Sequence, residues 1–110
     1  MIGRRALRPA AALAIGAAAG LACARRPART HAVAIRNFVY EPAALTVAPG
    51  DTVIWTNEDF VPHTATARDT LWDSKSISGA GAWRLVARRP GRHAYYCVFH
   101  PGMQGTIEVR

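Results

Sequence analysis

The chain has 110 residues, enough for one domain, and half of them are hydrophobic, so it can bury a core. Its formal net charge is +7, but it has no stripe of lysine and arginine with interleaved aromatic residues, which argues against nucleic-acid binding. Of the two cysteines, Cys23 follows the N-terminal apolar run and Cys97 lies near the end of the chain, so they need not form a disulfide.

The first segment, 1–22, has the pattern of an export signal. Arg4, Arg5 and Arg8 precede an alanine-rich apolar run at 10–22, which is too short to span a membrane as a helix of about 20 residues. The alternative is an ordinary N-terminal helix. The paired arginines leave open general secretion or the twin-arginine route. Removal of this segment lowers the net charge from +7 by three to +4, and the mature protein is expected in the periplasm or elsewhere outside the cytoplasm.

The stretch GLAC, which ends at Cys23, resembles a bacterial lipobox. The resemblance implies that Cys23 is the lipidated first residue of the mature protein and tethers it to a membrane. The alternative is ordinary cleavage near Ala22 or Ala24. In either case residues 23–31 are predicted to form a polar tether and residues 32–110 the folded domain.

From residue 31 onward the chain is expected to form short strands. Apolar residues alternate or cluster in HAVAIRNF, ALTVAPGDTVIWTN, HTATA, WRLVARRPGRHAYYC and GTIEV, and turn residues such as Pro49-Gly50 and Pro90-Gly91 interrupt them. Short runs with turn signals about every 8–12 residues predict an antiparallel sandwich or barrel. No helical period appears beyond the signal. The side chains expected in the core are Phe38, Trp55, Leu85 and Tyr95.

The motif YYCVFHPGMQG near the end of the chain joins two expected strands, 92–97 and 105–109. Pro101 and Gly102 prevent the connection from becoming a helix. We therefore expect a tight loop between these strands. Such a loop can gather its side chains around one point.

Cys97, His100 and Met103 stand three residues apart in this loop and supply a thiolate, an imidazole and a thioether. This soft donor set suits copper far better than calcium, magnesium or manganese. Zinc accepts cysteine and histidine, but it rarely takes methionine and usually needs four strong ligands. A Cys–His nucleophile is a further alternative, but Cys97 at a strand end beside Met103 is poorly placed for that role. The sequence therefore predicts a copper site and not an enzyme.

A trigonal site needs one more strong donor, and three other histidines are available. His31 lies at the end of the tether, where an exposed role without a metal is expected. His93 is four strand residues, roughly 13 Å, from Cys97, too far for one ion to join them. His63 ends the loop NEDFVPH, which can lie at the same end of a sandwich as Cys97. We therefore predict His63 as the second imidazole ligand.

These stretches together resemble the cupredoxins, the blue copper proteins of the plastocyanin and azurin type. The resemblance covers nearly all of 32–110 and rests on NFVYEPAALTVAPGDTVIWTNED, PHT, WDS and PGRHAYYCVFHPGMQGTIEV. The loop has two residues between its histidine and its methionine, as in amicyanin. The resemblance implies an eight-stranded Greek-key sandwich with one type 1 copper ion that cycles between Cu(I) and Cu(II). It also implies the ligands: equatorial His63, Cys97 and His100, and axial Met103.

One departure from the family concerns Thr64. Amicyanin and plastocyanin have an asparagine after the first histidine ligand, and this residue bonds the thiolate. With Thr64 at this position, the hydrogen bonding at the Cys97 sulfur stays open, and so does the reduction potential.

The resemblance implies a monomeric carrier of single electrons between redox proteins, such as a cytochrome and a reductase or dehydrogenase. The alternative is a copper-binding protein for storage, delivery or assembly of copper sites without redox turnover, although methionine-rich and histidine-rich tracts are absent from the sequence. Apolar residues of the two ligand loops are expected to form a docking face, or alternatively only to shield the copper from water. These residues are Phe60, Val61, Pro62, Phe99 and Pro101.

Positive charge is expected at the other end of the strand that leads to Cys97. Arg92 precedes Cys97 by five strand residues, roughly 17 Å, which exceeds the Debye length of about 8 Å at physiological salt. We therefore predict that Arg88, Arg89 and Arg92 do not recruit the redox partner. They either face anionic lipid headgroups or keep the domain soluble.

Overall fold

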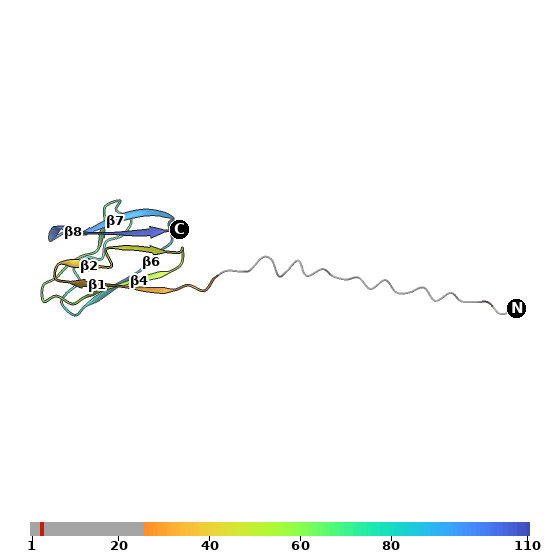
Figure 1. The fold of residues 1–110 in the computed structure, drawn as a ribbon, viewed down its shortest axis with the longest axis horizontal. Coiled ribbons are helices and arrows are strands. Elements are labelled where there is room, and N and C mark those ends of the chain that lie inside the picture. Colours follow the sequence, from red (N-terminus) through yellow and green to blue (C-terminus); the bar gives the residue numbers. More distant parts are fainter. Residues whose placement is uncertain (1–2, 4–25) are drawn as a thin grey trace.

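The computed structural model describes Gly3 and residues 26–110, and this part of the chain is all β-structure without a helix (Figure 1). The strands are β1 (Thr30–Arg36), β2 (Val39–Glu41), β3 (Ala44–Val47), β4 (Thr52–Asn57), β5 (Thr66–Ala67), β6 (Ala82–Val86), β7 (Gly91–Cys97) and β8 (His100–Val109). The predicted export signal, apart from Gly3, and the predicted lipidation site Cys23 lie outside the described residues. No helix in the described residues is long and apolar enough to cross a membrane.

The strands form two four-stranded sheets with the orders β2-β1-β4-β6 and β3-β8-β7-β5. The predicted eight-stranded sandwich is confirmed. The expectation of purely antiparallel pairing is wrong, because β1 pairs in parallel with β4, and β3 in parallel with β8. Parallel partners need a long connection between them, and other strands separate both pairs in the chain. Local alternation of apolar residues cannot reveal such pairs.

Alternation along the central strands fills the core. In β4, Val53 and Trp55 are fully buried, and Tyr95 of β7 approaches from the other sheet. The rings of Trp55 and Tyr95 meet edge to face at 5.4 Å, and burial raises the pKa of Tyr95 to about 12. Gly105 of β8 lies opposite Tyr95, and a Cβ there would stand 2.4 Å from the tyrosine ring. The absence of a side chain at Gly105 therefore makes room for Tyr95.

The core predictions hold with one exception. Trp55 and Tyr95 are confirmed as core residues, and Leu85 is partly buried against the core. Phe38 is instead 47% exposed, so its prediction is wrong. The turn between β1 and β2 holds Asn37 and Phe38 at φ values of 54° and 59°. This left-handed turn directs Phe38 to one end of the sandwich.

The strand register defines two ends of the sandwich. At one end, Thr52 pairs with both Thr30 and Val86, and β7 and β8 meet through Gly91 and Val109. We call this end the arginine pole, because six arginines lie at or beside these strand ends. They are Arg26, Arg29, Arg88, Arg89, Arg92 and Arg110. The opposite end, which contains the β7–β8 turn at Cys97, is the cysteine pole.

The segment expected as a tether partly folds onto the arginine pole. β1 begins at Thr30, and His31 is half-buried with Nε2 2.9 Å from Asp51 Oδ2. The expectation of an exposed His31 is therefore wrong. The buried carboxylate of Asp51 also accepts bonds from the Arg29 backbone N–H and the Arg26 guanidinium. The Arg29 N–H, followed by His31, holds the pKa of Asp51 far below its usual range.

Candidate metal centre

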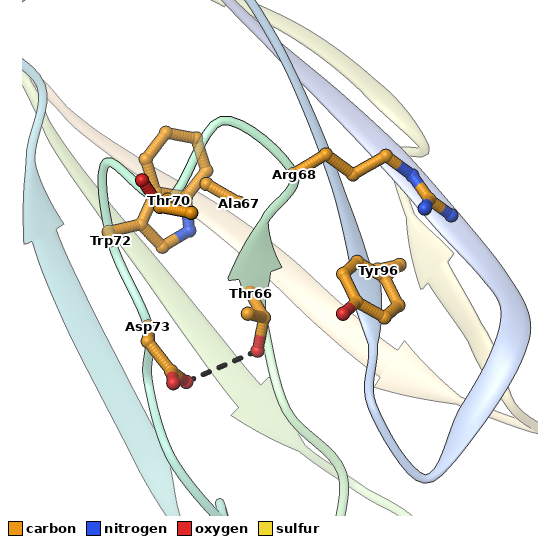
Figure 2. A pocket seen from close by; sticks show the side chains of 7 residues that line it. All are labelled: Thr66, Ala67, Arg68, Thr70, Trp72, Asp73 and Tyr96. Carbon is orange, nitrogen blue, oxygen red and sulfur yellow. Dashed lines mark hydrogen bonds between the residues drawn. The ribbon is translucent and has the colours of Figure 1, made fainter.

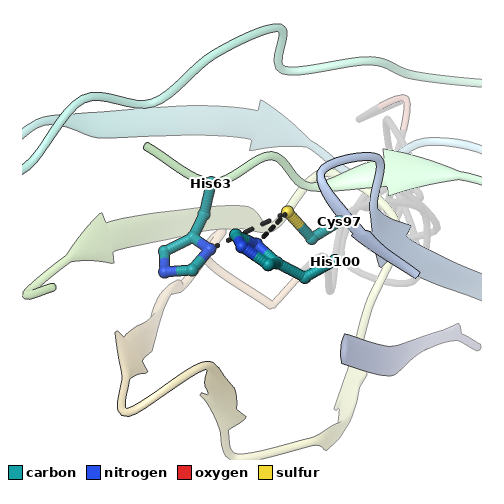
Figure 3. A group of neighbouring side chains, drawn as sticks. All are labelled: His63, Cys97 and His100. Atoms are coloured by element: carbon teal, nitrogen blue, oxygen red, sulfur yellow. Dashed lines mark hydrogen bonds between the residues drawn. The ribbon is translucent and has the colours of Figure 1, made fainter. Parts of the chain in front are cut away.

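Three side chains from two separate segments meet at the cysteine pole (Figure 3). Cys97 ends β7, His100 begins β8, and His63 lies between β4 and β5, where its backbone bridges to Ile77. The Cys97 sulfur and one ring nitrogen of each histidine all lie within 4.8 Å of one another. Cys97 and His63 are fully buried and His100 is half-buried. The centre therefore has one edge, at His100, that faces outward.

The separations between these donor atoms fit a shared metal ion. Cys97 Sγ lies 3.8 Å from His63 Nδ1 and 3.6 Å from His100 Nδ1. Metal–sulfur and metal–nitrogen bonds of about 2.3 and 2.0–2.1 Å, as at zinc, span about 3.5–3.8 Å when they meet at roughly 110–120°. A thiolate and two imidazoles at such angles are the donor set of a blue-copper site. The three residues therefore fit a bound copper ion.

The β7–β8 connection is tighter than the sequence suggests. β8 begins at His100, which pairs with Cys97, so only Val98 and Phe99 form the turn. The expectation of a loop that reaches Met103 is wrong. Pro101 fits into the strand because a register irregularity interrupts the ladder beside Cys97, and proline is tolerated at such places. Met103 thus lies on β8, 5% exposed, in the same buried cluster as Cys97.

Thr64 connects the two segments of the centre. Its backbone N–H donates to Cys97 Sγ at 3.3 Å. Its hydroxyl oxygen accepts bonds from the Val98 N–H at 3.0 Å and from the Thr66 hydroxyl at 2.9 Å. The bond at sulfur therefore comes from the main chain, while the threonine side chain ties down the β7–β8 turn. This geometry answers the question that the sequence leaves open at Thr64.

Asp59 holds the ring of His63 from the side away from the sulfur. His63 Nε2 lies 2.8 Å from Asp59 Oδ2 while Nδ1 faces the sulfur. The proton therefore belongs on Nε2, and the lone pair of Nδ1 is free to bind a metal. Burial opposes the ionisation of Asp59, but the N–H groups of Phe38 and Asn37 and the ring of His63 lower its pKa below the usual value.

Two residues of this centre escaped the sequence analysis. The ring of Phe38 meets His63 and His100 edge to face, with centroids 5.0 and 4.7 Å apart. Asp59 appeared in the sequence analysis only as a member of the loop NEDFVPH. An acidic residue four positions before a predicted ligand was a usable signal for Asp59. Phe38 gave no such signal, since it lies 25 residues before His63 in the sequence.

The residues predicted to form an apolar face are exposed. Phe60 is wholly exposed, Phe99 is 52% exposed, and Phe99 adjoins the half-buried His100 in the chain. Val61, Pro62 and Pro101 complete the set. Exposure alone does not distinguish docking from shielding, so the docking role stays a prediction.

Other polar clusters lie apart from the centre. A hollow of about 340 Å³ beside β5 and β7 is lined by residues that include Arg68, Trp72 and Tyr96, but by neither histidine of the centre (Figure 2). In its wall the Arg68 guanidinium lies 4.4 Å from the Tyr96 ring centroid. His93 is buried with Nδ1 2.6 Å from Asp69, and the cluster at Cys97 does not include it.

Known proteins share both the sequence pattern and the fold. The family model described as a cupredoxin-like domain matches residues 9–109. Amicyanin from Paracoccus versutus is 28% identical over 99% of each chain, and plastocyanin from Nostoc punctiforme is 32% identical over 66% of each. A solved structure, the purple cupredoxin from Nitrosopumilus maritimus, superposes with a TM-score of 0.69 at 30% identity. That match covers 73% of this chain and 99% of the other.

Proposed function

Since the chain belongs to the family of cupredoxin-like domains, we propose that it is an exported carrier of single electrons between redox proteins. Its cofactor is one copper ion, which supplies a one-electron Cu(I)/Cu(II) couple when bound. The observation that carries the proposal is the cluster of one buried thiol and two imidazoles, with Sγ–Nδ1 distances of 3.6 and 3.8 Å. Cys97 is fully buried, so its sulfur is poorly accessible as a nucleophile, which favours a carrier over an enzyme.

In this proposal His63, Cys97 and His100 are the strong ligands and Met103 is the weak axial ligand. Met103 is buried on β8, three residues after His100, which supports the axial role. The protein keeps the ring nitrogens oriented and excludes water from the sulfur. Since the ligands must be a thiolate and neutral imidazoles, copper affinity falls at low pH. The ligands lie on or beside strands, so little should move when the electron arrives.

Electrons are proposed to enter and leave at the His100 edge. The ring is half-buried, and its chain neighbours Phe99 and Pro101 are exposed. A partner such as a cytochrome, a reductase or a dehydrogenase would dock on the apolar face formed by these two residues with Phe60, Val61 and Pro62. The carrier is proposed to act as a monomer.

The cellular setting is also a proposal. Residues 1–22 would direct export, and residues 23–31 would form the tether of which Thr30 and His31 extend β1. Residues 32–110 would form the cupredoxin domain outside the cytoplasm, in the periplasm. Cys23 would carry the lipid anchor.

A visible spectrum with voltammetry of the copper-loaded protein tests the function. We expect intense thiolate-to-Cu(II) absorption, one copper ion per chain, and a fast reversible one-electron couple. A colourless Cu(II) protein, or one that binds zinc through Cys97 and ignores copper, would contradict the proposal. Rapid copper transfer to an apo acceptor without a reversible couple would instead favour copper delivery or storage.

A further inference from the structure

The carboxylate of Asp59 joins two distant segments of the cysteine pole. Oδ2 lies 2.8 Å from His63 Nε2 and accepts the Phe38 N–H at 2.9 Å, while Oδ1 accepts the Asn37 N–H at 2.7 Å. The Asp59 side chain is only 12% exposed, so water competes weakly for these bonds. The Asp59 carboxylate therefore binds both the outer nitrogen of His63 and the backbone N–H groups of the β1–β2 turn.

The β1–β2 turn requires this support. Asn37 and Phe38 both have positive φ values, 54° and 59°, and a bulky residue such as phenylalanine rarely adopts this conformation. Such a conformation is strained and persists only where the surroundings enforce it. The two N–H bonds to Asp59 provide that enforcement. The result is that the Phe38 ring lies against both His63 and His100.

Asp59 is itself held in place by buried groups. Its N–H donates to Asn57 Oδ1 at 2.9 Å, and Asn57 Nδ2 donates to the carbonyls of Val61 and Ile77 at 2.8 and 2.9 Å. Asn57 is fully buried at the end of β4. Gly79 passes so close that a Cβ there would stand 2.9 Å from the Asp59 carbonyl oxygen. This framework distinguishes Asp59 from a carboxylate that meets a histidine by chance on a mobile loop.

We propose that Asp59 is a positioning residue that fixes the ring of His63 and, through the same carboxylate, holds Phe38 as an apolar cover over both histidines. The proposal rests on the copper site proposed above, but it concerns a residue that is not a ligand. A carboxylate that accepts the outer N–H of a ligand histidine makes the ring a stronger donor, which favours Cu(II) over Cu(I). The Phe38 cover keeps water from the exposed edge, and low local polarity strengthens the effect of the charge.

The test compares Asp59→Asn with Asp73→Asn in the copper-loaded full chain. Asp73 is the control, since its carboxylate also accepts a backbone N–H, from Lys75, but does not contact the histidines. We expect Asp59→Asn to remain blue and to raise the reduction potential by about 59 mV. At a fixed applied potential, this is a roughly tenfold increase of the Cu(I)/Cu(II) ratio for a one-electron couple. Asp59→Glu, which keeps the charge, should recover part of the shift, and Asp73→Asn should show none.

NMR of the copper-free protein supplies a second readout. In Asp59→Asn the exchange-protected Nε2–H signal of His63 and the nuclear Overhauser contacts between Phe38 and His100 should weaken together. In Phe38→Leu the backbone N–H bonds to Asp59 remain, so the His63 signal should persist although the ring is gone. This second variant keeps the proposal testable if Asp59→Asn does not fold.

The outcomes separate the two proposals. If the wild type is not blue, the proposed function fails, while the copper-free NMR comparison still tests the positioning role. If the wild type is blue but Asp59→Asn lowers only the thermal midpoint, with potential and Phe38 contacts unchanged, the positioning role is overturned. A shifted potential with intact Phe38–His100 contacts, or loss of the His63 signal in Phe38→Leu, would overturn the link between ligand and cover.

Discussion

The two poles of the sandwich differ in how many basic side chains they expose. At the arginine pole the buried Asp51 is surrounded by donors, and six arginines leave the surface basic. At the cysteine pole the residues from 97 to 103 include no lysine or arginine. The nearby Arg36 is paired with both Glu41 and Glu58. The arginine pole is therefore a charged surface, whereas the cysteine pole has an apolar cover around the buried ligand atoms of the metal centre.

The distance between the poles separates their roles. Arg92 precedes Cys97 by five residues in β7, roughly 17 Å of strand, which is about twice the Debye length of about 8 Å at physiological salt. The arginines should therefore act weakly on the metal and on a partner docked beside it. If the poles are independent, changes at one pole should leave the properties of the other intact.

The largest expected effect is that of Cys97→Ser at the cysteine pole. A serine hydroxyl does not supply a thiolate, so the visible absorption of the copper-loaded protein should vanish completely and copper affinity should fall steeply. Absorption spectra and metal analysis measure both. Arg92→Ala, in the same strand at the opposite pole, is the control and should keep the full spectrum. A serine variant that stays blue would show that the sulfur is not a ligand.

The next effect concerns electron-transfer rates. Phe99→Lys or Pro101→Lys places a charge on the apolar face and should slow transfer to a cognate redox protein by about tenfold or more, the size of a docking hot spot. The double change Arg88→Ala with Arg89→Ala should alter the rate less than twofold, by roughly the small amount expected for charges beyond the screening length. Stopped-flow measurement at physiological salt compares them. A large loss only in the arginine variant would move docking to the other pole.

A smaller effect is expected from Met103→Gln. The amide oxygen is a harder donor than the thioether and favours Cu(II), so the potential should fall by about 59 mV, a tenfold change for one electron, or somewhat more. Met103→Leu, which removes the donor, should change the potential in the opposite direction. Voltammetry distinguishes them. If both variants match the wild type, Met103 is a core residue and not the axial ligand.

Much of the cysteine pole was predictable because its signals are local. The spacing of Cys97, His100 and Met103 and the soft character of their donors identify the metal class from the sequence alone. The alternating pattern around Trp55 and Tyr95 likewise predicts a sandwich core. These inferences need only neighbouring residues and the chemistry of side chains.

The features that escaped prediction depend on long-range contacts. Phe38 looks like a core residue, but its exposure follows from a left-handed turn held by Asp59, 21 residues further on. The half-burial of His31 depends on Asp51 across the β1–β4 pair. The parallel pairing of the strands is hidden for the same reason. In each case one residue's surroundings are supplied by a segment that its own sequence neighbourhood does not specify.

The smallest expected effect is a pH-dependent loss of stability when Asp51 at the arginine pole is changed to asparagine. The pKa of Asp51 is depressed in the folded state, first by the Arg29 N–H, so its carboxylate stabilises the fold above the unfolded value of about 3.9. That contribution is lost as the pH falls from there toward the folded pKa. Asp51→Asn should therefore lower the thermal midpoint by several degrees at pH 7. The difference in thermal midpoint between this variant and the wild type should become smaller below about pH 4, where residue 51 is neutral in the unfolded chains of both proteins.

The decisive measurement pairs thermal melts with the copper spectrum between pH 3 and 7, on the order of the range in which carboxylates titrate. Glu108→Gln is the control, because Glu108 also lies near the arginine pole but is more exposed and makes only a 3.8 Å contact with Arg110. Its melting point should barely change. Asp51→Asn should keep the wild-type visible spectrum at pH 7, because Asp51 directly precedes β4 at the end away from the centre. A variant that loses stability and copper colour together would mean that the poles are coupled through β4 and do not act independently.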